Sequence, residues 1–239
     1  MDESTAGSPS LRARAEGRVV SGALDRHRGT LALRARDWAS LNDGDLKRRA
    51  AVAANERDAV ELWGLVEAHL VTKGRAGIRI SRHTLRNYRR GLHDLVAAWQ
   101  DENLLRPSRD AADLYVTHLG ERLAPGTVRV KIASARALYR ALRWSGVTQL
   151  RPFEDVVLPR DPTAAWDKRQ PYTSEEVDRL LAVADPTDRV MVLLGAHAGL
   201  RPSEIVALAW GYVDVDAATV RVERGKGGKA GVVDRKSVV

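Results

Sequence analysis

The sequence contains no cysteine. This absence excludes disulfide bonds, thiolate nucleophiles and zinc sites built from cysteine ligands. The sequence also lacks an apolar run close to the roughly 18 residues that a membrane-spanning helix needs. The longest candidate, residues 190–200, contains His197, and the first ten residues do not follow the basic and apolar pattern of a signal peptide. We therefore expect a cytoplasmic protein that makes no contact with a membrane.

The charge of the chain is strongly positive. Its 239 residues include 39 Lys and Arg against 31 Asp and Glu, which gives a formal net charge of +8. The length suits one large or two modest domains, and a hydrophobic content of 44% is enough to bury a core. A positive surplus favours an anionic partner, and nucleic acid is a more common partner of this kind than a membrane surface.

The first two thirds of the chain predict helices. Residues 1–40 are rich in Ser, Gly, Ala and Arg and show no helical period, so we expect a poorly ordered tail. Residues 41–155 show amphipathic periods separated by short loops, which is typical of a helical bundle. We predict four helices: one capped by Asn42 or Asp43 and continuing to about residue 70, one from Ser81 to about 99, one over 110–122, and one from Pro125 to Ser145.

The last third has a different pattern. Residues 151–171 contain four of the nine prolines without any hydrophobic period, and we place an interdomain linker at 156–171. Thr173 and Glu176 form a capping box before a helix, which is followed by an apolar helix that ends near Gly199 and a short helix in SEIVALAW. The segments TVRVER and AGVVDR flank GKGGK and predict a β-hairpin. Residues 172–239 therefore predict a second domain of α+β type.

Two of the predicted helices carry rows of basic residues. The helix from Pro125 to Ser145 contains five basic residues and no acidic ones. At 100° per residue, four of them lie within an arc of about 60°, and Lys131 lies outside it. The row on this helix is Arg129, Arg136, Arg140 and Arg143, and the helix that begins at Ser81 carries Arg82, Arg86, Arg89 and His93. Because ordinary solvated faces mix both signs, we predict that the arginines of these rows, together with Lys131, contact DNA phosphates, with plain solvated surfaces as the alternative.

A third basic element lies in the predicted α+β domain. Gly199 interrupts a helix, Arg201 follows it, and Glu204 is one helical turn further on. A carboxylate at this spacing can hold the guanidinium rigidly, so that it binds two phosphate oxygens. Lys226 lies at the predicted hairpin tip and could deliver a proton to a leaving oxygen. An ordinary ion pair and an ordinary hairpin turn are the alternatives.

These motifs together resemble one family. AGLRPSEIVALAW followed by GKGGK resembles the first arginine box and the lysine hairpin of the tyrosine recombinases, which include phage integrases and Xer-type recombinases. SRHTLRNYRRGLHDLVAAW and GTVRVKIASARALYRALRWSGV resemble helices of the family's core-binding domain, and RPFEDVVLP resembles its exit to the linker. The resemblance spans about residues 75–230. It implies a mainly α fold, with a SAM-like helical core-binding domain followed by an incomplete α+β catalytic domain that contains a β-hairpin.

The resemblance also implies a mechanism. Members of the family cut one DNA strand by attack of a tyrosine on the scissile phosphate, which forms a 3′-phosphotyrosine and releases a 5′-hydroxyl. The covalent bond conserves the energy of the phosphodiester, so neither a metal nor a small-molecule cofactor is implied. By this resemblance Arg201 clamps the phosphate, Glu204 orients Arg201, and Lys226, rather than Lys229, protonates the leaving oxygen. The implied partners are double-stranded DNA and further copies of the chain on that DNA.

The sequence departs from the family pattern after the hairpin. The family's His-x-x-Arg box and nucleophilic tyrosine are expected there, whereas Tyr212 is the only tyrosine after Arg201 and lies where relatives usually carry Asp. His83 and Arg86 form a His-x-x-Arg by chance, in the wrong domain. We therefore expect a C-terminally truncated recombinase that is inactive alone and least stable over 171–239. The alternatives are a non-catalytic DNA-binding regulator or competitor at a recombination site, and a helical interaction module for an acidic protein.

Overall fold

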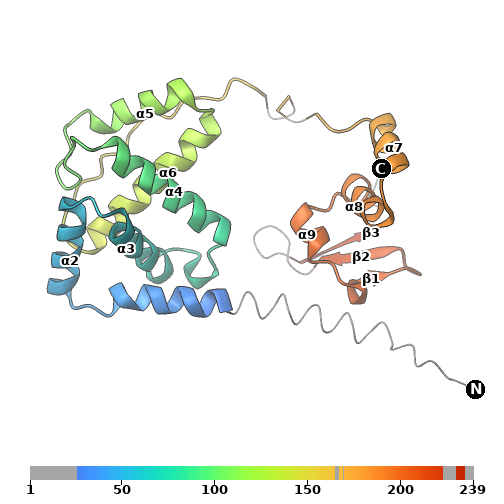
Figure 1. Cartoon of the computed structure of the whole chain (residues 1–239), viewed down its shortest axis with the longest axis horizontal. Helices are drawn as coiled ribbons and strands as arrows, with labels where there is room; N and C mark the ends of the chain where they lie inside the picture. Colours follow the sequence, from blue (N-terminus) through green and yellow to red (C-terminus); the bar gives the residue numbers. More distant parts are fainter. Residues whose placement is uncertain (1–25, 165–166, 169, 223–229, 235–239) are drawn as a thin grey trace, which may run out of the picture. The chain divides into compact units, whose positions relative to one another are not determined.

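The computed structural model describes residues 26–164, 167–168, 170–222 and 230–234, which fall into two compact units (Figure 1). The helical unit comprises residues 26–164, and the carboxy-terminal unit comprises the described residues that follow. The helical unit consists of a helix over residues 26–39, α2 (Asp43–Asn55), α3 (Ala59–Thr72), the 3-10 turn η1 (Gly77–Arg79), α4 (Arg82–Ala98), α5 (Ala111–Arg122) and α6 (Pro125–Trp144).

Local capping explains where the predicted helices begin and end. The Ser81 hydroxyl accepts a hydrogen bond of 3.0 Å from the Thr84 N–H and starts α4, as the sequence predicts. Pro125 occupies the first turn of α6, where its missing N–H is not needed. After α6, Gly146 adopts a φ of 77°, a left-handed conformation that favours glycine and ends the helix.

The single helix expected from residue 42 to about 70 is in fact two helices. Asn42 caps α2 as predicted, but the chain turns at Arg57, whose φ is 54°. The Asp58 side chain then accepts hydrogen bonds from the N–H groups of Val60 and Glu61 and starts α3. An aspartate inside an apolar periodic segment thus acts as a second N-cap, which the periodicity alone does not reveal.

The prediction of a poorly ordered tail is wrong for residues 26–39, while residues 1–25 lie outside the described part of the chain. Leu31, Ala35 and Trp38 of this helix are buried in the core of the helical unit. A Cβ atom at Gly64 of α3 would lie 2.6 Å from the Trp38 indole nitrogen, so the glycine allows the indole to pack against α3. The bundle therefore begins before residue 41, because this helix packs against α3.

Helix α6 is the centre of the helical unit and packs against α3, α4 and α5. At its crossing with α4, Gly91 faces the buried Ser134, and a Cβ at position 91 would lie 2.7 Å from the Ser134 Cβ. Real Cβ atoms do not approach so closely, so the glycine is needed for this crossing.

The segment after α6 packs onto the same core, although the sequence assigned its last part to a linker. Phe153 is buried and stacks on Trp99 with ring centroids 5.3 Å apart. Val156 is also buried, and Leu158 packs against the core. A linker over 156–171 therefore starts too early, because apolar contacts continue through Leu158 and the helical unit extends to residue 164.

The carboxy-terminal unit combines short helices with a small sheet, as predicted. Its elements are α7 (Ser174–Val183), α8 (Pro186–Ala196), α9 (Pro202–Val206), η2 (Trp210–Tyr212), β1 (Val213–Asp214), β2 (Thr219–Val222) and β3 (Gly231–Asp234). The predicted capping box is present, since Thr173 Oγ1 accepts from the Glu176 N–H at 3.2 Å and Thr173 N–H donates to the Glu176 carboxylate at 2.9 Å. The predicted hairpin is confirmed as the antiparallel pair β2–β3, with Val220 opposite Val233, and β1 adds a third strand beside β2.

The carboxy-terminal unit has little buried core. Within its described residues, only Leu200, Glu204 and Ala209 are buried, and neither α7 nor α8 contains a buried residue. Across the described part of the chain, the helices are too short or too polar to span a lipid bilayer.

We predict that Gly91→Ala destabilises the helical unit by about 1–3 kcal/mol, because the added methyl group overlaps Ser134 and forces α4 away from α6. Urea unfolding followed by far-UV circular dichroism measures this change. Gly120→Ala in α5 is the matched control, since nothing lies within 4 Å of its Cβ position and alanine favours helices. Equal stability of the two variants would contradict the role of Gly91.

Candidate nucleic-acid interface

The predicted arginine row of α4 lies on an exposed surface. Arg82, Arg86 and Arg89 are all exposed. They line a pocket of about 670 Å³ formed with the helix over 26–39, α2 and α3. The other charged side chains that line this pocket form ion pairs with one another. Arg34 pairs with Glu67, and Arg49 pairs with Asp37 and Glu61. Arg86 and Arg89 of the α4 row therefore add positive charge to this pocket.

The basic residues of α6 differ in their surroundings, although all five were predicted to contact DNA. Arg129 and Arg140 are exposed and make no hydrogen bond or ion pair with other described residues. Lys131 forms an ion pair with Asp94 of α4, and its side chain is only 17% exposed. The charge of Lys131 is thus compensated at the α4–α6 contact, whereas Arg129 and Arg140 present uncompensated charge.

Two other arginines of α6 hold the chain that follows the helix. Arg136 Nε donates to the Phe153 carbonyl at 2.8 Å, and Arg136 Nη2 donates to the Glu154 carbonyl at 3.3 Å. Arg143 Nη1 donates to the Leu150 carbonyl at 3.3 Å. These guanidiniums satisfy backbone carbonyls and fix residues 150–154 against α6, so both have a structural role besides their charge.

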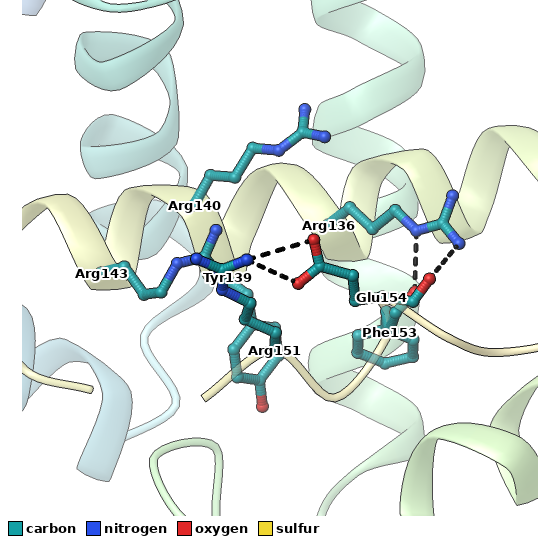
Figure 2. Close-up of a pocket in the computed structure, with 7 residues that line it drawn as sticks. All are labelled: Arg136, Tyr139, Arg140, Arg143, Arg151, Phe153 and Glu154. Carbon is teal, nitrogen blue, oxygen red and sulfur yellow. Dashed lines mark hydrogen bonds and ion pairs between the residues drawn. The ribbon is translucent and has the colours of Figure 1, made fainter. Parts of the chain in front are cut away.

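A second pocket, of about 240 Å³, lies between α6 and residues 151–154 (Figure 2). Its lining residues are Arg136, Tyr139, Arg140, Arg143, Arg151, Phe153 and Glu154. Arg151 and Glu154 were not predicted as site residues, because the prolines of residues 151–171 indicated a linker. Phe153, the one phenylalanine of the chain, was the signal for packing there, since a large apolar side chain rarely lies in a solvated linker.

His69 of α3 lies beneath the α6 arginines. Its ring is 5.8 Å from the ring of Trp144, and its Nδ1 is buried without a hydrogen-bond partner among the described residues. Burial lowers the pKa of His69, and the nearby positive charges of Arg140 and Arg143 lower it further. Burial also lowers the pKa of Arg143, with a contribution from Arg151. Positive charge is therefore concentrated on this side of α6.

The predicted pair of Arg201 and Glu204 is formed in the carboxy-terminal unit. Arg201 precedes α9, its backbone N–H donates to Glu204 Oε2 at 2.8 Å, and its Nη1 donates to Glu204 Oε1 at 2.7 Å. The Glu204 side chain is 6% exposed, whereas that of Arg201 is 58% exposed. A buried carboxylate thus fixes the backbone and the guanidinium of a residue whose remaining N–H groups face solvent.

The two predicted lysines of the hairpin, Lys226 and Lys229, lie outside the described residues. They belong to the sequence that connects β2 to β3. Tyr212 is partly buried in η2. No cluster of three or more His, Asp or Glu side chains that could hold a metal ion occurs within the described ranges.

Both units match known families. Residues 77–146 match the family described as "Phage integrase, N-terminal SAM-like domain", and residues 171–235 match the "Phage integrase family". The chain belongs to the tyrosine recombinase family. The match over 77–146 covers η1 and α4 to α6, and the match over 171–235 includes Arg201 and Glu204. The first three helices of the bundle, over 26–39 and in α2 and α3, precede both matched ranges.

Individual relatives share parts of this recombinase-family chain. The chain is 32% identical over 170 residues to the tyrosine recombinase XerC of Xanthomonas campestris pv. campestris (strain B100), covering 65% of this chain and 50% of that protein. It is 50% identical over 64 residues to XerA of Thermococcus kodakarensis, covering 26% and 23%. A solved structure of the Tn1549 transposon integrase in complex with circular intermediate DNA aligns at 16% identity over 72% of this chain and 58% of that one, with a TM-score of 0.46. The chain spans about half the length of the curated XerC relatives it matches.

The lowered pKa of His69 predicts a pH dependence of stability. A histidine that binds a proton more weakly when folded than when unfolded costs stability as the pH falls below its unfolded pKa of about 6.5. We expect the melting temperature of the helical unit to fall between pH 7 and pH 5, and to fall less in His69→Phe, which keeps the ring but not the titration. His118→Gln on the exposed side of α5 is the control. Identical pH profiles for wild type and His69→Phe would contradict the assignment.

We also predict that Glu204→Ala accelerates hydrogen exchange of the Arg201 backbone amide, because that N–H loses its acceptor. Glu204→Gln keeps a carbonyl oxygen within reach of the amide and should retain most of the protection. Exchange measured residue by residue by NMR distinguishes the variants. Unchanged exchange in Glu204→Ala would show that the hydrogen bond does not form in solution.

Proposed function

We propose that this chain binds duplex DNA and acts in site-specific recombination, with Arg201 as the group that binds the scissile phosphate. The observation that carries the proposal is the Arg201–Glu204 geometry within a family match. A guanidinium fixed by a buried carboxylate, with its other N–H groups exposed, is suited to stabilise charge on a phosphoryl group in the transition state. Glu204 is then a positioning residue.

The proposed DNA-contacting surface includes fewer residues than the basic residues that the sequence predicts as DNA contacts. Arg129 and Arg140 of α6 and the exposed row of α4 supply the phosphate contacts. Lys131 and Arg136 contribute less directly, because the first is paired with Asp94 and the second holds the 153–154 backbone. The DNA lies in the cytoplasm, and further copies of the chain bind neighbouring sites on it.

Lys226 completes the proposed strand cleavage. A tyrosine oxygen that has lost its proton to solvent forms a bond to the scissile phosphorus while the bond to the 5′-oxygen breaks, and the 5′-oxygen leaves with a proton from the Lys226 ammonium. The described residues do not assign this tyrosine. Arg201 binds non-bridging oxygens throughout, so the phosphodiester is exchanged without hydrolysis.

We expect Arg140→Ala to weaken binding to a mixed-sequence duplex and to reduce the slope of log Kd against log salt by about 1, because one phosphate contact is lost. Fluorescence anisotropy at several salt concentrations measures both quantities. Arg36→Ala, an exposed arginine of the helix over 26–39 that lines neither pocket, is the control for net charge. Duplex affinity that is equally reduced in both variants would remove α6 from the interface, and no binding at low salt would overturn the proposal.

A second candidate function is DNA binding without strand cleavage, as in a regulator or competitor at a recombination site. It is favoured by one observation: Tyr212, the only tyrosine after Arg201 in these 239 residues, is partly buried. Incubation of the chain with nicked duplexes and denaturing electrophoresis test it. A covalent protein–DNA adduct would refute this candidate, and its loss in Tyr212→Phe would identify the nucleophile.

A further inference from the structure

The pocket between α6 and residues 151–154 contains one carboxylate among four guanidiniums. The lining guanidiniums are those of Arg136, Arg140, Arg143 and Arg151, and the carboxylate is that of Glu154 (Figure 2). A pocket with this excess of positive charge fits an anion with several oxygen acceptors. Glu154 supplies the only carboxylate of the pocket lining.

Glu154 already binds one of these guanidiniums in the free protein. Arg151 Nη1 lies 3.0 Å from Glu154 Oε2 and 3.3 Å from Oε1. Both side chains are exposed, at 60% and 53%. Exposed ion pairs are weak and exchange readily with solvent ions, so the carboxylate can be replaced by another anion.

The backbone at Glu154 is held independently of its carboxylate. Arg136 binds the carbonyls of Phe153 and Glu154, and the Phe153 ring is buried against Trp99. Release of the Glu154 side chain therefore leaves residues 153–154 in place, and the pocket keeps its shape when the carboxylate moves out.

We propose that the Glu154 carboxylate occupies the position of a DNA backbone phosphate, and that a phosphate displaces it on binding and pairs with Arg151 beside Arg140 and Arg143. Carboxylates and phosphates bind guanidinium groups with similar two-oxygen geometry, which makes one an intramolecular substitute for the other. Glu154 thus weakens the binding of a duplex whose phosphate must displace the carboxylate from this pocket. The inference rests on the proposed DNA-binding function and adds a residue that regulates it.

The test compares Glu154→Gln with Asp45→Asn on the same mixed-sequence duplex. Asp45 pairs with Arg48 at 3.2 Å, three residues further along α2, and their side chains are 45% and 75% exposed, so both substitutions remove one negative charge from an exposed ion pair of the same spacing. We expect Glu154→Gln to raise the affinity at low salt roughly three- to tenfold, because the phosphate no longer competes with or approaches a carboxylate. Asp45→Asn should change the affinity much less.

A second comparison tests whether the effect passes through Arg151. In an Arg151→Ala background, Glu154→Gln should give a clearly smaller gain in affinity, because the guanidinium that the phosphate would take over is absent. Equal gains in Glu154→Gln and Asp45→Asn, or an undiminished gain in the Arg151→Ala background, would overturn this inference while leaving DNA binding intact. Absence of duplex binding by every variant would overturn the proposed function and the inference together.

Discussion

The close crossing of α4 and α6 determines the arrangement of the helical unit. Because Gly91 has no side chain, Ser134 of α6 can approach the α4 backbone, and the two helices bury their apolar faces against one another. The same crossing carries the ion pair of Lys131 with Asp94. Phe153 and the segment after α6 then pack beside this helix pair, which creates the arginine-lined pocket. The position of the basic surface thus follows from packing in the core.

The arginines of α6 show why positive charge on a helix is not equivalent to a binding surface. Arg136 and Arg143 bind backbone carbonyls, whereas Arg140, on the same arc of the helix, is exposed. A guanidinium that satisfies a carbonyl contributes to the folded structure first, and its availability to a ligand is limited. Pairing and exposure, rather than helical position, therefore separate the proposed phosphate contacts from the structural arginines.

Features encoded locally could be predicted, and features encoded by distant packing could not. Ser81 and Thr173 accept hydrogen bonds from neighbouring N–H groups, and Pro125 suits a first helical turn, so these helix starts follow directly from the sequence, as does the β2–β3 hairpin. The helix over 26–39 was missed although Leu31, Ala35 and Trp38 repeat at helical spacing, because its stability depends on burial against α3. The pair of Arg201 and Glu204 was predictable from its three-residue spacing, whereas the pocket at Glu154 depends on a chain segment that folds back onto α6.

Glu204 is one of very few buried residues among those described in the carboxy-terminal unit. The carboxylate that orients Arg201 also fills what little interior the unit has. Under the proposed function, a substitution of Glu204 therefore affects both the orientation of Arg201 and the packing of the unit. The Arg201 side chain is exposed and contributes little to the interior, so its replacement affects phosphate binding more than folding.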